Sequence, residues 1–339
     1  MRSKPDAVGG GRFPGPDVSS VPPTPARTAA PPLAIPSPAL ARYAVLALLG
    51  SVVTGLLLVL DPRQLAGEPL WLKPLKFFLS SAIAAATIEG IVRWSGLRLR
   101  RLEACRSIIA WGFAFEMLII CGQAARGVRS HFNLSTGLDS ALFTAMGLVI
   151  TVVVVAMAVA VVTASGRASR LARVERVAVR WGIGIFVAAA FLGNLMVRAT
   201  PAQGLRAPAD GWPGERGSHF VGSEEGATRT MPITGWSRES GDLRVPHFVG
   251  MHAIQGLLLL AWVLRRLGVS MEGSGPTRGV GVTGGLLAVV WAMALFQALA
   301  GQSLVDPGPW RTGLWVALGG LGTTVVWLLT ASREKVVAA

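Results

Sequence analysis

The stretch LDSALFTAMGLVITVVVVAMAVAVVT, residues 138–163, decides the fold class of this chain. After Asp139 it contains no charged residue. A helix of about 20 apolar residues is long enough to cross the roughly 30 Å hydrocarbon core of a bilayer. An open strand there would leave its backbone polar groups without partners in lipid. The stretch therefore predicts a transmembrane helix.

Seven further apolar stretches of similar length accompany it along the chain. They lie at about 42–60, 71–92, 105–124, 178–197, 247–265, 279–300 and 312–331. The composition agrees with them: 52% of the 339 residues are hydrophobic and 15% are charged, where a soluble domain has about 25% charged. We therefore predict an all-α, polytopic membrane helix bundle with about eight transmembrane helices. This composition argues against a soluble enzyme and against a disordered or fibrous protein.

Three regions of different character divide the chain. Residues 1–40 hold ten of the 21 prolines, cannot bury a core and predict a disordered cytoplasmic tail that is not a signal peptide. Residues 41–332 form the predicted transmembrane domain, and its longest outer loop is 198–246. Residues 333–339 form a short cytoplasmic tail.

The arginine distribution predicts how the helices cross the membrane. Arginines gather in segments 93–106 and 164–180, between apolar stretches, and basic residues flank both ends of the domain. Positive charge accumulates in cytoplasmic loops, so both termini are expected in the cytoplasm, with an even number of spans. The net charge of +14 is explained by the cytoplasmic membrane and its anionic lipids. Arginines in separate loops form no basic stripe, and nucleic acid is not an expected partner.

A first polar cluster begins inside the third apolar stretch. Glu116 lies in its middle, and Gln123 and Arg126 share its helical face. Arg129 and His131 follow in the loop. An isolated carboxylate at the position of Glu116 is either neutral or paired with a cation from another helix. A proton or substrate site and a purely structural pairing both stay open.

A second polar cluster surrounds the start of the sixth stretch. His247, His252 and Gln255 fall on one half of the predicted helix. The two histidines are five residues apart, so they are not the i, i+4 pair of a zinc protease. They ligate a metal or hydrogen-bond a neighbouring helix. Asp242 and Arg244 precede them, and either pair with each other or act as acid–base group and anion ligand.

A third cluster, Lys73 and Lys76, lies one helical turn apart at the outer mouth of the second stretch. Together with Arg126, Arg129 and Arg244, these lysines place positive charge on the side of the membrane where it is disfavoured. They extend to lipid phosphates, or they form a basic rim that holds an anion such as a phosphate, a carboxylate or a haem propionate.

Three strings carry a resemblance to a known group of proteins. WLKPLKF (71–77), QAARG followed by SHFN (123–133) and GDLRVPHFVG (241–250) resemble a family of uncharacterised multi-pass bacterial membrane proteins. The likeness covers most of residues 70–260. It implies that these strings form one unit, and it implies no activity, cofactor or substrate.

The leading functional hypothesis is a membrane oxidoreductase that depends on a metal or haem at the outer end of the bundle. Its predicted ligands are the four histidines, and its predicted acid–base groups are Glu116 and Asp242. The histidines are His131, His219, His247 and His252. The alternatives are a proton-coupled transporter of a small anionic solute, an enzyme acting on lipid headgroups or other anions, and a structural or sensory protein. The sequence does not specify the cofactor, the substrate or the oligomeric state.

The predicted topology is tested by cysteine labelling in a background without Cys105 and Cys121. Arg100→Cys, Ala172→Cys and Ser270→Cys should react only with a reagent in the cytoplasm, because their loops are rich in arginine. Glu225→Cys should react from the outside. Labelling of Ala172→Cys by an impermeant reagent added outside would contradict the eight-span arrangement.

Overall fold

The computed structural model describes residues 38–65, 67–198, 214–222, 229–305, 308, 313–314, 316–325 and 327. Most of the predicted N-terminal tail, the last residues of the chain and parts of the loop 198–246 lie outside these residues. Pro38, predicted to lie in the tail, is the first residue of a helix. The helices are α1 (Pro38–Leu60), α2 (Leu72–Ser95), α3 (Arg100–Ala125), α4 (Gly137–Ala164), α5 (Arg173–Phe191), α6 (Gly193–Met196), α8 (Arg244–Met251), α9 (Ala253–Arg266) and α10 (Ser274–Leu299).

Seven of the predicted spans appear as helical segments that are long and apolar enough to cross a membrane. They are α1, α2, α3, α4, α5 with α6, α8 with α9, and α10. The eighth predicted span is helical over Val316–Val325, and several of its other residues lie outside the described part of the chain. The all-α, polytopic bundle predicted from the sequence is thereby confirmed. The side of the membrane on which the termini lie stays a prediction.

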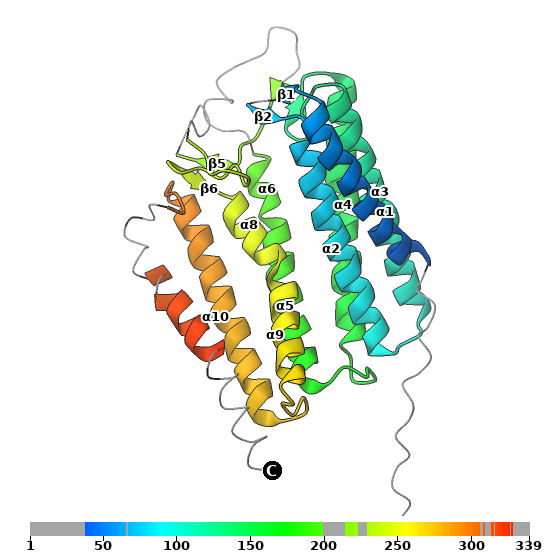
Figure 1. Ribbon diagram of the computed structural model, residues 1–339, viewed down its shortest axis with the longest axis vertical. Coiled ribbons are helices and arrows are strands. Elements are labelled where there is room, and N and C mark those ends of the chain that lie inside the picture. Colours follow the sequence, from blue (N-terminus) through cyan, green and yellow to red (C-terminus); the bar gives the residue numbers. More distant parts are fainter. Residues whose placement is uncertain are drawn as a thin grey trace, which may run out of the picture. The chain divides into compact units, whose positions relative to one another are not determined.

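Three short antiparallel strand pairs close one end of the helices, which we call the capped end (Figure 1). They are β1 (Gln64–Leu65) with β2 (Glu68–Pro69), β3 (Asn133–Leu134) with β4 (Gly214–Glu215), and β5 (Phe220–Val221) with β6 (Gly241–Asp242). The last two pairs bring the described parts of the segment 198–246 onto the ends of the helices.

The helices pack in two neighbouring groups. Helices α1 to α4 pack on one another, while α5 packs against α8, α9 and α10. The main apolar core lies within the first group and extends to Phe186 of α5 and Ile254 of α9. Gly182 allows α5 to approach α9 closely, since a Cβ there would lie 2.5 Å from the Cα of Ile254. The polar helices α3 and α8–α9 thus belong mainly to different groups.

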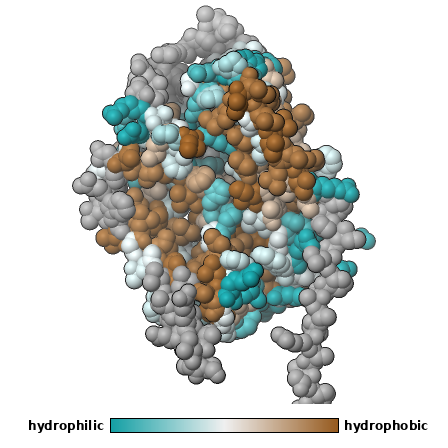
Figure 2. Space-filling view, in the orientation of Figure 1, coloured by the Kyte–Doolittle hydropathy of each residue, from teal (hydrophilic) through white to brown (hydrophobic). Residues whose placement is uncertain are grey.

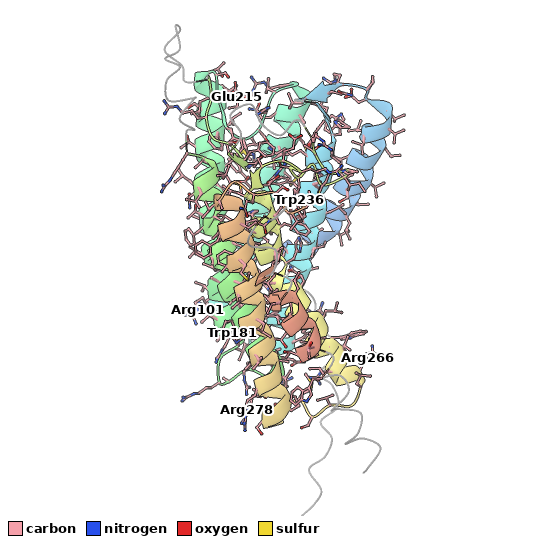
Figure 3. The ribbon with its side chains drawn as sticks, turned by 90° about the vertical axis from the view of Figure 1, so that its left-hand side faces the viewer. Arg101, Trp181, Glu215, Trp236, Arg266 and Arg278 are labelled. Carbon is pink, nitrogen blue, oxygen red and sulfur yellow. The ribbon has the colours of Figure 1, made fainter. Side chains whose placement is uncertain are left out.

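The loops at the opposite end, which we call the arginine end, contact one another. The Arg170 amide donates to the Ser95 carbonyl at 2.9 Å, and the Val174 amide donates to the Met271 carbonyl at 3.0 Å. Arg266 and Arg278 lie toward this end, and Glu215 lies at the capped end (Figure 3). The arginine-rich loops between α2 and α3, α4 and α5, and α9 and α10 therefore share one end of the bundle.

The outer face of the bundle is apolar. On α1, Leu46, Val52 and Val59 are more than half exposed, and Val59 is 83% exposed. Hydrophobic side chains cover the visible face over α1 (Figure 2). An apolar surface of this extent is favourable in lipid and unfavourable in water. These helices therefore contact the acyl chains of a bilayer.

A buried ion pair joins α2 to α3 toward the arginine end. The Arg106 Nε lies 3.0 Å from an oxygen of Glu89, and the two side chains are 8% and 7% exposed. Arg106 also pairs with Glu103 at 2.5 Å. The predicted arginine-rich segment 93–106 and the predicted stretch 105–124 both include Arg106, and α3 begins six residues before it. This contact makes α2 and α3 one unit.

Arg106→Met should lower the free energy of unfolding by about 3–5 kcal/mol, because it leaves the Glu89 carboxylate buried without its cation. The double variant Arg106→Met/Glu89→Leu should recover most of this loss, and thermal unfolding in detergent measures both. Arg265→Met is the matched control, since its pair with Glu175 is half exposed and is worth less than about 1 kcal/mol. Equal losses for the two single variants would contradict a buried role for Arg106.

Candidate functional site

At the capped end, the first turn of α2 meets the loop between α3 and α4. The Nζ of Lys73 lies 3.1 Å from the Nδ1 of His131, and the Ser130 hydroxyl oxygen lies at the same distance from that nitrogen. An ammonium has donors and no acceptor, so Nδ1 accepts the hydrogen bond from Lys73. The neutral imidazole then carries its proton on Nε2. His131 therefore presents an N–H donor on the side of its ring that faces away from Lys73.

Aromatic rings enclose the two histidines of this region. His131 lies with its centroid 5.7 Å from Phe77 and 6.1 Å from Phe143. His219 packs edge-to-face on Phe132 at 4.9 Å. Phe132 has a φ of 65°, a left-handed conformation that is uncommon outside glycine. This backbone turn places the Phe132 ring against His219, the residue that immediately precedes β5.

The electrostatics of this region keep both imidazoles neutral. Burial lowers the pKa of His131 well below 6.5, and the charge of Lys73 and the neighbouring His219 lower it further. The pKa of His219 is also well below 6.5, first through burial and then through the charges of Arg244, Lys73 and Arg129. These mutual effects show that the capped end gathers cations and imidazoles. A neutral imidazole at pH 7 is available to donate or accept a hydrogen bond.

Lys76 lies one turn further along α2, under the segment that precedes β6. Its Nζ donates to the Thr234 carbonyl at 3.4 Å, and it interacts electrostatically with Glu68 and Arg244. The Arg244 guanidinium also donates to the Gly235 carbonyl at 2.5 Å. These contacts hold the segment 231–236 against the mouth of α2.

Asp242 organises the cap and uses both of its oxygens to do so. It accepts from the Ser237 amide at 2.9 Å and from the Arg244 amide at 3.0 Å, and it pairs with the Arg244 guanidinium at 2.7 Å. Its side chain is 1% exposed. The acid–base role predicted for Asp242 has no support in this geometry, because its lone pairs are engaged.

A second group of predicted site residues forms a bridge between α3 and α4. The Asp139 Oδ1 accepts from Gln123 Nε2 and from Arg126 Nη1, both at 2.8 Å, and Arg126 also donates to the Gln123 carbonyl oxygen. Thr136 caps the N-terminus of α4 by accepting from the Asp139 amide, and the two residues have the spacing of a capping box. Gln123 and Arg126 thus have a structural role in connecting the two helices. Arg129 pairs with Glu215 at 3.0 Å and links the loop to β4.

The two histidines of the sixth span lie near helix ends. His247 Nδ1 donates to the Ala189 carbonyl at 2.7 Å, near the end of α5, which leaves a lone pair on Nε2. His252 stands at the junction of α8 and α9, with its ring 4.4 Å from that of Phe248. The side-chain amide of Gln255 forms a hydrogen bond with the Thr87 hydroxyl of α2, at 3.2 Å.

The predicted set of metal ligands is not assembled in the described part of the chain. Among these residues, no group of three or more His, Cys, Asp or Glu side chains lies close enough to hold one metal ion. The rings of His131 and His219 both pack on Phe132, whereas His247 contacts α5 and His252 contacts Phe248. His131 and His219 therefore share one environment, and His247 and His252 lie in others.

Glu116 differs from the other acidic residues of the bundle. It is 6% exposed, and its Oε1 has no hydrogen-bond partner. Lys73 interacts with it electrostatically from α2, and Tyr43 interacts with it from α1. Tyr43 in turn donates to the Ser81 hydroxyl at 2.7 Å. A carboxyl group in this environment is expensive to keep charged, which makes it a candidate for proton binding.

Two contributors to this region, Glu68 and Tyr43, were not predicted from the sequence. Tyr43 is the single tyrosine of the chain and lies in an apolar helix, so its hydroxyl was an available signal. Glu68 lies in an ordinary loop, and nothing in its local sequence marks it. The site thus joins Lys73, Lys76, His131 and His219 at the capped end with Glu116, which lies deeper within α3.

The fold and this arrangement define a multi-pass integral membrane protein with a polar, cation-rich site at one end of its helices. Comparisons with models of protein families, with curated proteins and with solved structures find no match for the chain. The resemblance to uncharacterised bacterial membrane proteins therefore stays a prediction. The function has to be argued from the site.

Lys73→Met should raise the pKa of His131, because it removes a cation that disfavours protonation of the ring. The pKa should stay below 6.5, since burial is the larger cause. An NMR titration of histidine-labelled protein in detergent, with the His131 signal assigned through His131→Asn, measures this pKa. Lys76→Met should leave the pKa of His131 unchanged.

His131 binds a proton near pH 6.5 in the unfolded chain and at lower pH in the folded chain, so the free energy of unfolding should decrease as the pH falls below about 6.5. A pKa of 6.5 for His131 in the wild type would contradict the contact with Lys73.

Proposed function

We propose that this chain is a proton-coupled transporter of a small anionic solute, with its anion site at the capped end. The observation that carries the proposal is an excess of positive charge. None of the ion pairs among the described residues includes Lys73 or Lys76. The arginines of the same end, Arg126, Arg129 and Arg244, each have a carboxylate partner.

Two unpaired lysines within a helix bundle favour a bound anion. A cation that is partly removed from water interacts strongly with a negative charge, because the surroundings screen it poorly. The Nε2–H of His131 is a further neutral donor at the same end of the bundle, on the side of the ring away from Lys73. Ammonium and N–H groups of this kind bind the oxygens of a phosphate, a sulfonate or a carboxylate.

Two features favour transport over catalysis on an anion. The described site offers no pairing of a nucleophile with a base, since Asp242 is engaged with Arg244 and the Nδ1 of His131 is engaged with Lys73. The helices beside it are discontinuous: α5 gives way to α6 at Leu192, and α8 gives way to α9 at His252. Interrupted helices of this kind border the substrate sites of many transporters.

The metal- or haem-dependent oxidoreductase predicted from the sequence has less support. The described residues offer the lone pair of His247 Nε2 as a single oriented ligand and gather no ligand set around it. The lysines that we assigned to haem propionates are accounted for equally well by a small anion. A lipid headgroup has the same chemistry as a free phosphate, and the experiment has to separate them.

Vesicles of purely zwitterionic lipid containing the purified protein should accumulate radiolabelled inorganic phosphate or methanesulfonate when an inward proton gradient is imposed. Lys73→Met should reduce the initial rate about tenfold or more, as expected for the loss of one buried charge–anion contact of roughly 1.4 kcal/mol. Arg63→Met is the matched control, because Arg63 is half exposed at the same end and paired with Asp61.

Uptake equal to that of protein-free vesicles would contradict transport of these anions. Binding of phosphatidylglycerol by the detergent-solubilised protein, without binding of either free anion, would instead assign the lysines to lipid headgroups. Equal uptake by Lys73→Met and the wild type would remove Lys73 from the site.

A further inference from the structure

We infer that Lys73 couples the proton to the anion, because its single positive charge serves both the anion site and the Glu116 carboxylate. The inference rests on the anion transport proposed above and adds its coupling mechanism. The two ligands bind cooperatively: a proton on Glu116 frees the charge of Lys73 for the anion. Their movement is then a symport, with proton and anion travelling together.

The position of Lys73 is the first step of the argument. Lys73 lies at the second residue of α2, with its Nζ 3.1 Å from His131 on the side of the cap. It also interacts electrostatically with Glu116, which lies within α3 about 14 Å from its C-terminal end at 1.5 Å per residue. Lys73 therefore lies between the anion site at the cap and Glu116 in the interior of the bundle.

The lack of a close partner for Glu116 is the second step. Glu116 is only 6% exposed, and its Oε1 makes no hydrogen bond. A carboxylate that is ionised there depends on Lys73 for compensation. A carboxyl group that takes up a proton becomes neutral and needs no cation. The summed charge of Glu116 and Lys73 therefore differs between the ionised and the protonated state of Glu116.

The charge balance of the two states gives the sign of the coupling. With Glu116 ionised, Glu116 and Lys73 sum to zero, and a bound anion would leave one uncompensated negative charge in the bundle. With Glu116 protonated, the pair carries one positive charge, and a bound anion restores neutrality. Burial makes neutrality favourable, so the proton strengthens anion binding, and the anion strengthens proton binding by the same factor.

Other titratable groups surround this pair and define the necessary controls. Tyr43 approaches Glu116 from α1, Cys121 lies near Tyr43 on α3, and Glu68 and Arg129 act on Lys73 from the loops. The residues of α4 in the adjoining apolar cluster are Met146 and Leu142. His131 and His219 have pKa values well below 6.5 and stay neutral above that pH. They therefore contribute no charge change between pH 6.5 and 8.5.

The test is the affinity of the full-length, detergent-purified protein for methanesulfonate, measured by titration calorimetry at pH 6.5 and 8.5. This anion of a strong acid keeps its charge across the range, so any pH dependence belongs to the protein. The wild type should bind it more tightly at pH 6.5, on the order of 5–150-fold, the range of coupled binding sites. Glu116→Gln mimics the protonated carboxyl and should bind tightly at both pH values.

Two further measurements keep the inference open to refutation if Glu116→Gln unfolds. The wild type, in weak buffer at pH 7.5 with an indicator dye, should take up protons when methanesulfonate is added. Glu116→Asp should retain the pH dependence, and so should Cys121→Ser, which removes the neighbouring thiol. Thermal unfolding and size-exclusion chromatography show which variants are folded.

The outcomes separate this inference from the function on which it rests. If neither methanesulfonate nor phosphate binds any folded variant at either pH, anion binding at this site is wrong. If methanesulfonate binds and Glu116→Gln keeps the full pH dependence, the titration of Lys73 or another group causes it, and the coupling through Glu116 is wrong. Proton release on binding would reverse the sign and contradict a symport.

Discussion

The cost of holding a charge away from water governs where polar residues stand in this bundle. A buried ion loses several kcal/mol of hydration, and an opposite charge with good geometry returns much of it. Arg106 and Glu89 meet this condition as a buried pair, and the buried Asp139 meets it through the partly exposed Arg126. Both pairs also tie adjacent helices together. The same constraint makes the exceptions informative, because an unpaired lysine or carboxyl group costs stability that packing alone would not require. Lys73 and Glu116 are these exceptions.

The cap determines which polar groups meet at this end. Pairing of β3 with β4 and of β5 with β6 draws residues from the segment 198–246 onto the loop between α3 and α4 and onto the start of α8. Asp242 fixes the second pairing by accepting from the Ser237 and Arg244 amides. His219 then packs on the ring of Phe132, and His131, which precedes Phe132 in the chain, hydrogen-bonds with Lys73. A site of this kind depends on backbone contacts between segments about 80 residues apart, as in Asn133 with Glu215.

Helix existence was predictable because hydrophobic length is a local property. The predicted stretch 138–163 corresponds to α4, which is one residue longer at each end. The spacing between Thr136 and Asp139 is that of a helix cap, and Thr136 does cap α4. The junctions at Leu192 and His252 were not predicted, since neither contains proline and both depend on contacts with neighbouring helices. The contacts that Gln123 and Gln255 make with neighbouring helices were also not predicted. Their amides bridge helices, and a helical periodicity does not reveal what lies on the facing helix.

The sequence by itself determined that this is a membrane protein, that its polar residues concentrate at the ends of a few helices, and that Glu116 and the lysines of WLKPLKF are unusual. These conclusions follow from the free-energy cost of a charge in lipid, because each apolar stretch can be recognised from its own residues without knowledge of the fold. The tertiary structure decided which of the unusual residues are compensated. Among the described residues, Arg244 and Arg126 each form an ion pair with a carboxylate, whereas Lys73 and Lys76 form none and interact with carboxylates only at longer range. Compensation is a matter of distance between helices, and only packing sets that distance.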